Sequence, residues 1–138
     1  MPSLTVSSTN LRSPLARATL AVVVTQVLHD LDHVRQGRSA STEVAVAAAL
    51  AWVATIVLVV LVVRRHRQAG LYAAVFGATI AIGFVLVHGL PRWSALSDSY
   101  GDANVDALSW VLAAIPFAAG LVLAACGLQA MRDHRTRR

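Results

Sequence analysis

Residues 44–63 read VAVAAALAWVATIVLVVLVV, a run of twenty residues without one charged side chain. Two more uncharged, largely apolar runs follow, at residues 69–87 and 107–131. About 18 consecutive apolar residues in a helix are enough to cross a hydrocarbon layer roughly 30 Å thick. The sequence therefore predicts an all-α integral membrane protein.

The composition supports this class and argues against others. Of the 138 residues, 57% are hydrophobic and only 14% are charged, against roughly 25% charged in ordinary soluble domains. All twelve basic residues are arginines that flank the apolar runs instead of forming one patch, so no nucleic-acid partner is expected. The single cysteine, Cys126, excludes a disulfide framework within one chain. Arginine without lysine, with many alanines and valines, is typical of GC-rich bacterial genomes.

A first span is harder to recognise because a polar segment interrupts it. Its uncharged part is only residues 18–28, which at 1.5 Å per residue covers roughly half of the hydrocarbon layer. The helix can cross if it runs from about residue 14 to residue 35, with Pro14 in its first turn. The polar segment HDLDHVRQG, residues 29–37, then lies in the last turns of a membrane helix and not in a loop.

These segments predict a four-transmembrane-helix bundle with both termini in the cytoplasm (N-in/C-in). The expected parts are a disordered cytoplasmic tail (1–13), spans near residues 14–35, 43–65, 69–90 and 105–131, and a basic cytoplasmic tail (132–138). Nine of the twelve arginines then lie on the cytoplasmic side, as the positive-inside rule requires. With three spans and the first helix on the membrane surface, the arginine-rich ends would lie on opposite sides. We therefore expect a multi-pass protein of the cell membrane, in a bacterium the plasma membrane.

Histidines and aspartates gather at the outer ends of the predicted spans. His29 and His33 are one turn apart on the same face of the first span, and His88 lies at the outer end of the third. Histidines at i and i+4 can bind one metal ion from one helical face, and carboxylates can complete or orient such a site. We therefore predict a metal site of His29, His33 and His88, with Asp32 or Asp30 assisting. Three histidines suit zinc or a similar divalent ion.

Further polar side chains are expected in the same outer pocket. They are Gln26, Gln36, Glu43, Asp98, Tyr100, Asp106 and Ser109. Small residues at helical spacing mark close helix contacts, because tight packing drives helix association in lipid. These packing positions are Gly70, Ala74, Gly77, Ala81, Gly120 and Gly127.

The cost of charge in lipid predicts which way the first span faces. A charged side chain at mid-membrane costs about 2.5–3.5 kcal/mol on insertion scales, and less near the interface. Asp32 and His33 should therefore face the bundle interior, toward His88. Arg35 and Arg38 are expected to reach outward to the lipid head groups.

The predicted function is that of a small polytopic membrane protein with an extracytoplasmic, His- and Asp-lined pocket that binds a zinc-like divalent metal. An open metal position would lower the pKa of a bound water, as in metal-dependent hydrolases. Three alternatives stay open: a non-enzymatic accessory subunit of a larger membrane complex, a b-type haem protein with one ligand from the first span and His88 as the other, and a proton relay. The expected partners are the lipid bilayer and a homo-oligomer or larger membrane complex.

Overall fold

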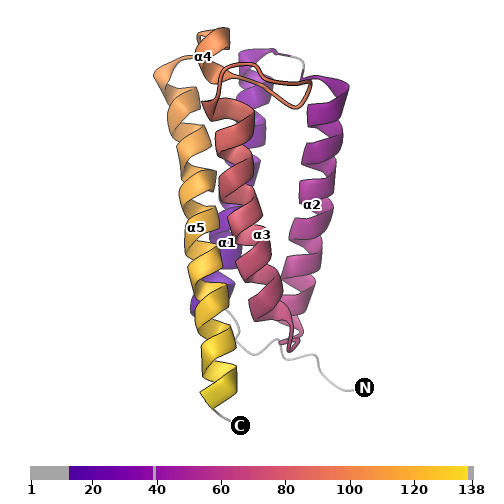
Figure 1. The fold of residues 1–138 in the computed structure, drawn as a ribbon, viewed down its shortest axis with the longest axis vertical. Helices are drawn as coiled ribbons and strands as arrows, with labels where there is room; N and C mark the ends of the chain where they lie inside the picture. Colours follow the sequence, from indigo (N-terminus) through magenta and orange to yellow (C-terminus); the bar gives the residue numbers. More distant parts are fainter. Residues whose placement is uncertain (1–12, 39, 137–138) are drawn as a thin grey trace, which may run out of the picture.

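The computed structural model describes residues 13–38 and 40–136 of the chain. The tail predicted at residues 1–13 lies outside this part except for Ser13, as do the last two residues of the predicted basic tail. The described residues form helices and connecting turns, with no strand among them. In chain order (Figure 1) the helices are α1 (Pro14–Gln36), α2 (Thr42–Val63), α3 (Ala69–Phe84), the π-helix η2 (Val85–Gly89), α4 (Tyr100–Ala103) and α5 (Ala107–Thr136).

The four long helices, α1, α2, α3 and α5, run along one another (Figure 1). The beginning of α1, the turn between α2 and α3, and the end of α5 lie at one end of the molecule. The short helix α4 and the loop before it cover the other end, which we call the α4 end. Successive long helices alternate in direction, so the last turns of α1 and the end of α3 both lie at the α4 end.

Helices α3 and α5 form the most extensive contact in the fold. A Cβ added at Gly77 of α3 would lie 2.5 Å from the carbonyl oxygen of Gly120 and 2.6 Å from the amide nitrogen of Ala124. A Cβ added at Gly127 of α5 would lie 2.5 Å from the amide nitrogen of Ala74. The two backbones therefore touch at positions where only glycine fits. The packing residues expected from the sequence all lie in this contact: Gly70, Ala74, Gly77, Ala81, Gly120 and Gly127.

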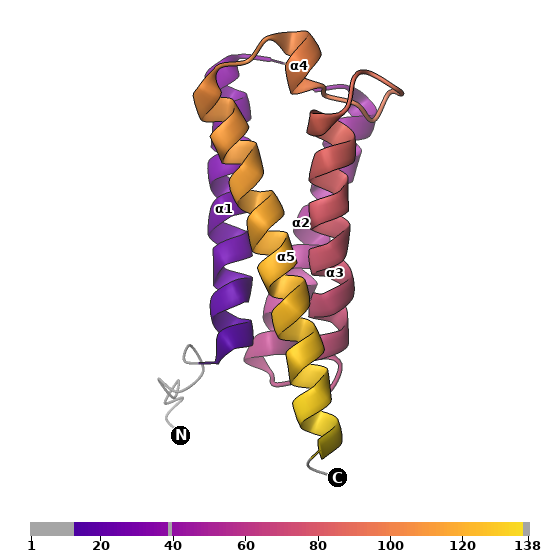
Figure 2. The same ribbon diagram turned by 60° about the vertical axis from the view of Figure 1, so that its left-hand side comes forward.

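Helix α5 runs obliquely across the molecule (Figure 2). It lies beside α1 at the α4 end and beside α3 at the opposite end, and these are its two main contacts. Helix α2 stands further from the others, since only Thr55 and Leu58 of its residues are buried. The bundle is therefore tight around α5 and loose around α2.

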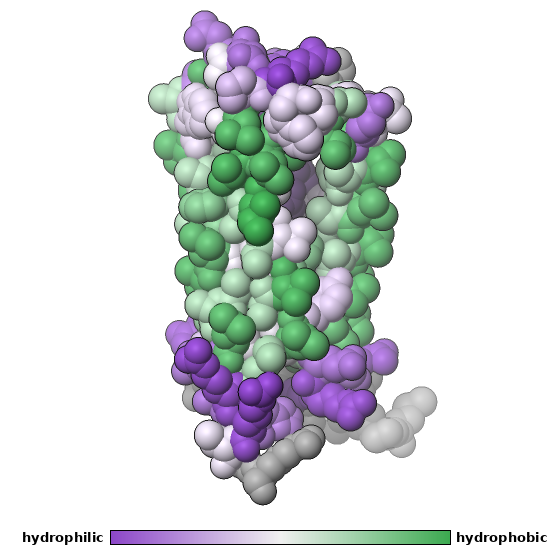
Figure 3. Space-filling view, viewed as in Figure 1, coloured by the Kyte–Doolittle hydropathy of each residue, from purple (hydrophilic) through white to green (hydrophobic). Residues whose placement is uncertain are grey.

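Among the described residues, three helical segments are long and apolar enough to cross a membrane: Thr42–Val63, Ala69–Gly89 and Ala107–Thr136. They correspond to the second, third and fourth spans expected from the sequence. On the face shown in Figure 3, hydrophobic side chains form a band around the middle and hydrophilic ones gather at both ends. The chain is thus an all-helical protein with apolar helices suited to contact with lipid. Helix α1 does not belong to these three segments.

Helix α1 turns its polar residues inward and its aliphatic residues outward. The Ser13 hydroxyl caps its beginning by accepting from the amide of Ala16 at 3.1 Å, and Gly37 ends it with a left-handed φ of 62°. Its buried polar side chains are Thr19, Thr25, Gln26, His29 and Asp32. Large aliphatic side chains lie on the exposed side: Leu20, Val24, Val27, Leu28, Leu31 and Val34. These polar residues lower the mean hydropathy of α1, while its exposed side remains largely aliphatic.

Two elements at the α4 end differ from what the sequence predicted. The third apolar segment ends in the π-helix η2 instead of continuing as α-helix, and the predicted loop contains the short helix α4. The last carbonyls of a helix lack partners within the helix, and the amide of Asp98 donates to the carbonyl of Val87 at 2.9 Å. A contact with the loop after η2 therefore accompanies the change from α-helix to π-helix, and helical periodicity does not reveal such a contact. At the opposite end, α5 continues to Thr136, beyond the expected end of the span.

Candidate metal site

Three histidine side chains converge at the α4 end, two from α1 and one from η2. The ring centroids of His29 and His33 are 4.7 Å apart, those of His29 and His88 are 5.0 Å apart, and those of His33 and His88 are 5.5 Å apart. One ring nitrogen from each residue lies within 4.8 Å of the other two. These three histidines are therefore close enough to hold one metal ion.

The Nε2 atoms of His29 and His33 are 3.2 Å apart. Either one of these atoms carries a proton and donates it to the other, or both present a lone pair to a third partner. Two nitrogen ligands of a tetrahedral zinc ion, each about 2.0–2.1 Å from the metal, lie about 3.3 Å from each other. The observed spacing thus matches the distance between two ligands of one ion.

His88 already has the hydrogen bond that fixes the tautomer a metal ligand needs. Its Nδ1 atom lies 3.1 Å from the backbone carbonyl oxygen of Asp98. A carbonyl oxygen only accepts, so Nδ1 donates and the lone pair of the ring is on Nε2. Metal-binding histidines usually donate their other ring N–H to a carbonyl or carboxylate in this way.

The Asp98 carboxylate lies near the Nδ1 atoms of two of the three rings. Its Oδ2 atom lies 3.6 Å from Nδ1 of His33 and 3.7 Å from Nδ1 of His88. Its Oδ1 atom accepts from Nη2 of Arg38 at 2.6 Å, which balances the charge of this mostly buried carboxylate. Asp98 therefore occupies the supporting position that the sequence analysis assigned to Asp32 or Asp30. It reaches that position from the loop after η2, which no helical spacing relates to His29 and His33.

His29 is the most enclosed of the three rings, with 4% of its surface exposed. Within the described part of the chain, its Nδ1 atom is the one buried side-chain polar atom without a hydrogen-bond partner. The backbone carbonyl of Leu112 on α5 is near enough to act electrostatically on this ring, but it lies outside hydrogen-bonding geometry. The unpaired atom is Nδ1 and not the Nε2 that faces His33, so the proton of His29 can stay on Nδ1, toward Leu112, and leave the lone pair on Nε2.

Tyr100, the first residue of α4, covers the three histidines at the α4 end. Its side chain is fully buried, and its hydroxyl oxygen lies 3.3 Å from Nε2 of His33, the same nitrogen that faces His29. Burial raises the pKa of the Tyr100 phenol to about 12, so the hydroxyl keeps its proton at neutral pH. It can therefore donate a hydrogen bond to His33 or to an oxygen atom placed beside the histidines.

Asp32 lies apart from the histidine group, in a polar contact between α1 and α5. Its carboxylate accepts from Nε of Arg35 at 2.7 Å and from Nε2 of Gln36 at 2.6 Å. The two terminal nitrogens of Arg35 donate to Asp106 at 2.9 Å each, and Arg35 and Gln36 each donate to Ser109 at 3.0 Å. Hydrogen bonds among these five side chains connect the last turns of α1 to the start of α5.

The two arginines of this region do not reach outward as the sequence analysis expected. Arg35 bonds to Asp32 and Asp106, and Arg38 bonds to Asp98. The expectation was wrong because buried carboxylates require a cation nearby, and these arginines are within reach of them. The hydrogen bonds from Arg35, and then that from the Ser109 amide, hold the pKa of Asp106 at about 2.

Asp30 and Glu43, the remaining acids named from the sequence, lie outside the histidine group. Asp30 accepts from the indole nitrogen of Trp52 at 2.7 Å and from the side-chain amide of Gln26 at 3.2 Å. Both donors are neutral, and within residues 13–38 and 40–136 the Asp30 carboxylate makes no ion pair. Glu43 is exposed in the first turn of α2. The bond from Trp52 was not foreseen, because an indole in an apolar run is more often a packing residue.

A cavity of about 610 Å³ adjoins the histidines. Its polar end is lined by His29, His33, His88, Asp30, Gln26 and Arg38, and mostly small or apolar side chains of α2 and α3 line the remainder. In Figure 3 a recess with polar atoms in its depth lies below the hydrophilic cap, on the side where α2 stands away from α3. The histidine site is therefore connected to a chamber within the apolar band.

Comparison with known protein families, with curated proteins and with solved structures finds no match for this chain.

Proposed function

We propose that this protein binds a zinc-like divalent ion through His29, His33 and His88 at the extracytoplasmic end of a four-span membrane domain. The observation that carries the proposal is the pair of facing Nε2 atoms of His29 and His33, 3.2 Å apart, beside a third histidine whose Nε2 lone pair is left available. Three neutral nitrogen ligands are a common protein donor set for zinc, and they leave a fourth position for another ligand. The backbone carbonyl of Asp98 accepts from His88, and the Asp98 carboxylate lies 3.6 Å from Nδ1 of His33.

The charge of the site also favours a cation. Three imidazoles, the Asp30 carboxylate and the Arg38 guanidinium line the same end of the cavity, and the charge of Arg38 is balanced by the Asp98 carboxylate. The carboxylate of Asp30 therefore gives this end of the cavity a net negative charge in apolar surroundings. A buried charge without a counter-charge is costly, so a bound cation stabilises this arrangement.

The residues around the proposed ion divide its chemistry among them. A zinc ion with an open position lowers the pKa of a bound water and polarises carbonyl groups. The three histidines would hold the ion, the backbone carbonyl of Asp98 keeps the proton of His88 on Nδ1, and the Asp98 carboxylate lies near Nδ1 of His33. The neutral phenol of Tyr100 donates a hydrogen bond to an oxygen atom beside His33. This set of roles supports binding and, with a suitable substrate, hydrolysis.

We further propose that α1 is the fourth span. Its 23 residues extend about 34 Å at 1.5 Å per residue, which is enough to cross a bilayer core. Its exposed side is aliphatic and its polar side is buried, as a span that contacts lipid requires. Both termini then lie in the cytoplasm of a bacterial plasma membrane.

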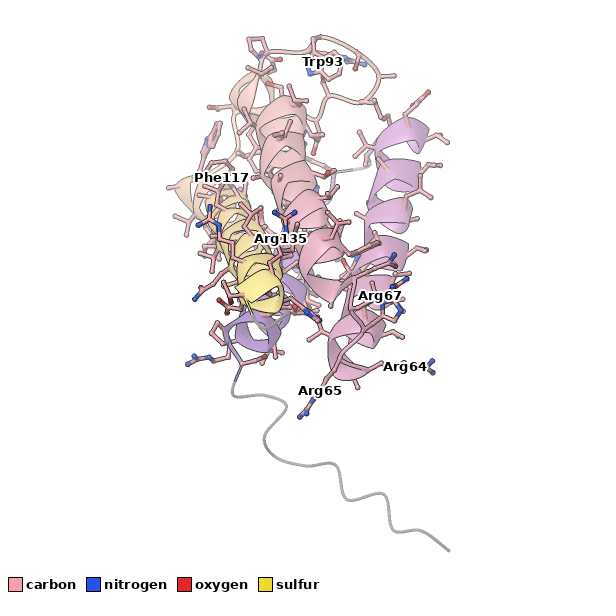
Figure 4. All side chains as sticks on the ribbon, turned by 60° about the horizontal axis from the view of Figure 1, so that its bottom comes forward. Arg64, Arg65, Arg67, Trp93, Phe117 and Arg135 are labelled. Atoms are coloured by element: carbon pink, nitrogen blue, oxygen red, sulfur yellow. The ribbon has the colours of Figure 1, made fainter. Side chains whose placement is uncertain are left out.

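The arginines support this orientation. At the end opposite α4 the described residues include Arg17 and the arginines of the α2–α3 turn and the last turns of α5. Figure 4 looks onto this end and shows Arg64, Arg65 and Arg67 pointing away from the helices, with Trp93 at the far end. The excess of arginine marks this end as cytoplasmic under the positive-inside rule.

Cysteine labelling in spheroplasts tests the topology. In a Cys126→Ala background, Ser97→Cys is expected to react with a membrane-impermeant maleimide, because residue 97 lies in the loop at the α4 end. Arg135→Cys is expected to react only after the membrane is permeabilised. Labelling of Arg135→Cys in sealed spheroplasts, with Ser97→Cys protected, would reverse the proposed orientation.

Metal analysis of the purified protein tests the site. The full chain is purified in detergent with an affinity tag that contains no histidine, without chelator, and analysed by inductively coupled plasma mass spectrometry and by optical spectroscopy. We expect about one zinc ion per chain and no Soret band. A Soret band would show that the site binds haem and not zinc. The absence of both metal and haem after incubation with zinc would contradict the metal site and favour the function of an accessory subunit.

A further inference from the structure

The cavity beside the histidines has the shape and lining of a chamber for one hydrocarbon chain. It is about 610 Å³ in volume, within the range of roughly 300–1,000 Å³ common for small-molecule pockets. Small side chains make its walls on the α2 side, among them Ala47 and Ala51, and Gly83 contributes from α3. A Cβ added at Gly83 would meet no atom within 4 Å, so this glycine borders open space and not a helix contact.

The cavity opens on the side where α2 and α3 stand apart. Its apolar part lies between α2 and α3, where α2 is loosely packed and a recess opens in the apolar band (Figure 3). Its polar end also reaches Arg38, Ala40 and Leu96 at the α4 end, while the buried Tyr100 and Ser99 lie over the histidines. A ligand that enters sideways through hydrocarbon must itself carry a hydrocarbon chain.

The charge at the polar end selects the head group of such a ligand. With a divalent ion on three neutral histidines, the ion and the Asp30 carboxylate together leave one positive charge. The Arg38–Asp98 pair adds none, because its two charges cancel. A charge buried in apolar surroundings requires compensation, so the fitting head group carries one negative charge. A carboxylate provides this charge together with an oxygen ligand for zinc.

We propose that the cavity binds a long-chain fatty acid from the surrounding lipid, with its carboxylate on the metal and its chain between α2 and α3. This inference rests on the proposed zinc site and goes beyond it by naming the ligand class. The carboxylate takes the fourth position of the ion, within reach of the Tyr100 hydroxyl. The chain lies along Ala47, Ala51 and Gly83.

The test uses the zinc-loaded full chain in lipid nanodiscs and a long-chain fatty acid with a diazirine near its methyl end. The methyl ester of the same probe is the matched ligand control, because it keeps the chain and loses the charge. We expect saturable photolabelling of residues on the cavity walls, mapped by mass spectrometry. Labelling by the ester is expected to be at least about tenfold weaker, since the charged contact to the ion is lost.

Two variants separate the cavity from the protein surface. Gly83→Leu fills open space in the cavity and is expected to remove the specific labelling while zinc content stays at the wild-type level. Ala51→Leu, on the opposite wall, should act in the same way if Gly83→Leu is poorly folded. Ala114→Leu adds the same side chain at an exposed position of α5 and should change neither labelling nor zinc content.

Zinc content measured in the same samples separates the two proposals. Full zinc occupancy with no saturable labelling, or equal labelling by acid and ester, would overturn the fatty-acid site and leave the metal site standing. Labelling of the cavity by the acid in protein that cannot bind zinc would overturn the carboxylate–metal contact and the proposed function together. A third outcome is that the chain binds no zinc, the probe does not label the cavity, and α2 is crosslinked to a second copy of the chain. This outcome would overturn both proposals and show that the cavity faces a protein.

Discussion

Replacing His29 by alanine is expected to weaken zinc binding by on the order of 100-fold or more. Zinc sites with four protein ligands bind with roughly 10–16 kcal/mol, so one ligand accounts for about 3 kcal/mol, or about two orders of magnitude in affinity. His29 is the most buried of the three ligands and is one turn from His33, so no other side chain of α1 can replace it. The measurement is competition of the purified variant against a fluorescent zinc chelator.

The chain provides a matched control and an intermediate case for this measurement. His134→Ala removes an exposed histidine from the last turn of α5, at the other end of the molecule, and should leave zinc affinity unchanged. Asp98→Asn keeps all three ligands and the backbone carbonyl that accepts from His88, but removes the carboxylate charge beside His33, so about 10-fold weaker binding is expected, at the low end of the effect of losing such a supporting group. Equal affinities of His29→Ala and His134→Ala would remove the basis of the proposed metal site.

Replacing Gly77 by alanine is expected to lower the free energy of unfolding by about 1–3 kcal/mol or more, the usual cost of overpacking a tight core. The added methyl group would lie 2.5 Å from the Gly120 carbonyl oxygen, and backbone atoms cannot rotate away as a side chain can. Helices α3 and α5 must therefore separate, which weakens the most extensive contact in the fold. The measurement is unfolding in mixed micelles titrated with sodium dodecyl sulfate and followed by circular dichroism.

Gly83→Ala is the matched control in the same helix. It makes the same chemical change at a position where the new methyl group meets no atom within 4 Å. The loss of glycine flexibility is similar at both positions, so Gly83→Ala should be neutral or stabilising by up to about 1 kcal/mol. If both variants unfold at the same detergent ratio, the backbones of α3 and α5 do not touch as described.

Periodicity in the sequence is enough to predict the apolar helices and the convergence of three histidines. The i, i+4 spacing places His29 and His33 on one face because a helix has 3.6 residues per turn, and a third histidine follows at the end of a helix that returns to the same end. The small residues of α3 and α5 follow the same rule. Local regularities of this kind can be read from the chain because each depends on residues a few positions apart.

The parts that the sequence did not predict depend on contacts between distant segments. Asp98 supports the histidines from a loop, and its position depends on the bond between its amide and the carbonyl of Val87. Arg35 does not reach outward because Asp106, just before α5, is within reach. No periodic pattern encodes these pairings, since the sequence separation of such partners is set by the loop and not by the helix.

The polarity of α1 sets an order of events during biosynthesis. The polar side chains of α1 are synthesised before α5, so at first only their partners within α1 are available, such as Arg35 for Asp32. Its main partner, α5, follows the other described helices in the chain, and Asp106 and Ser109, which accept from Arg35 and Gln36, come only with that segment. The complete set of polar contacts of α1 therefore forms only after α5 has been synthesised.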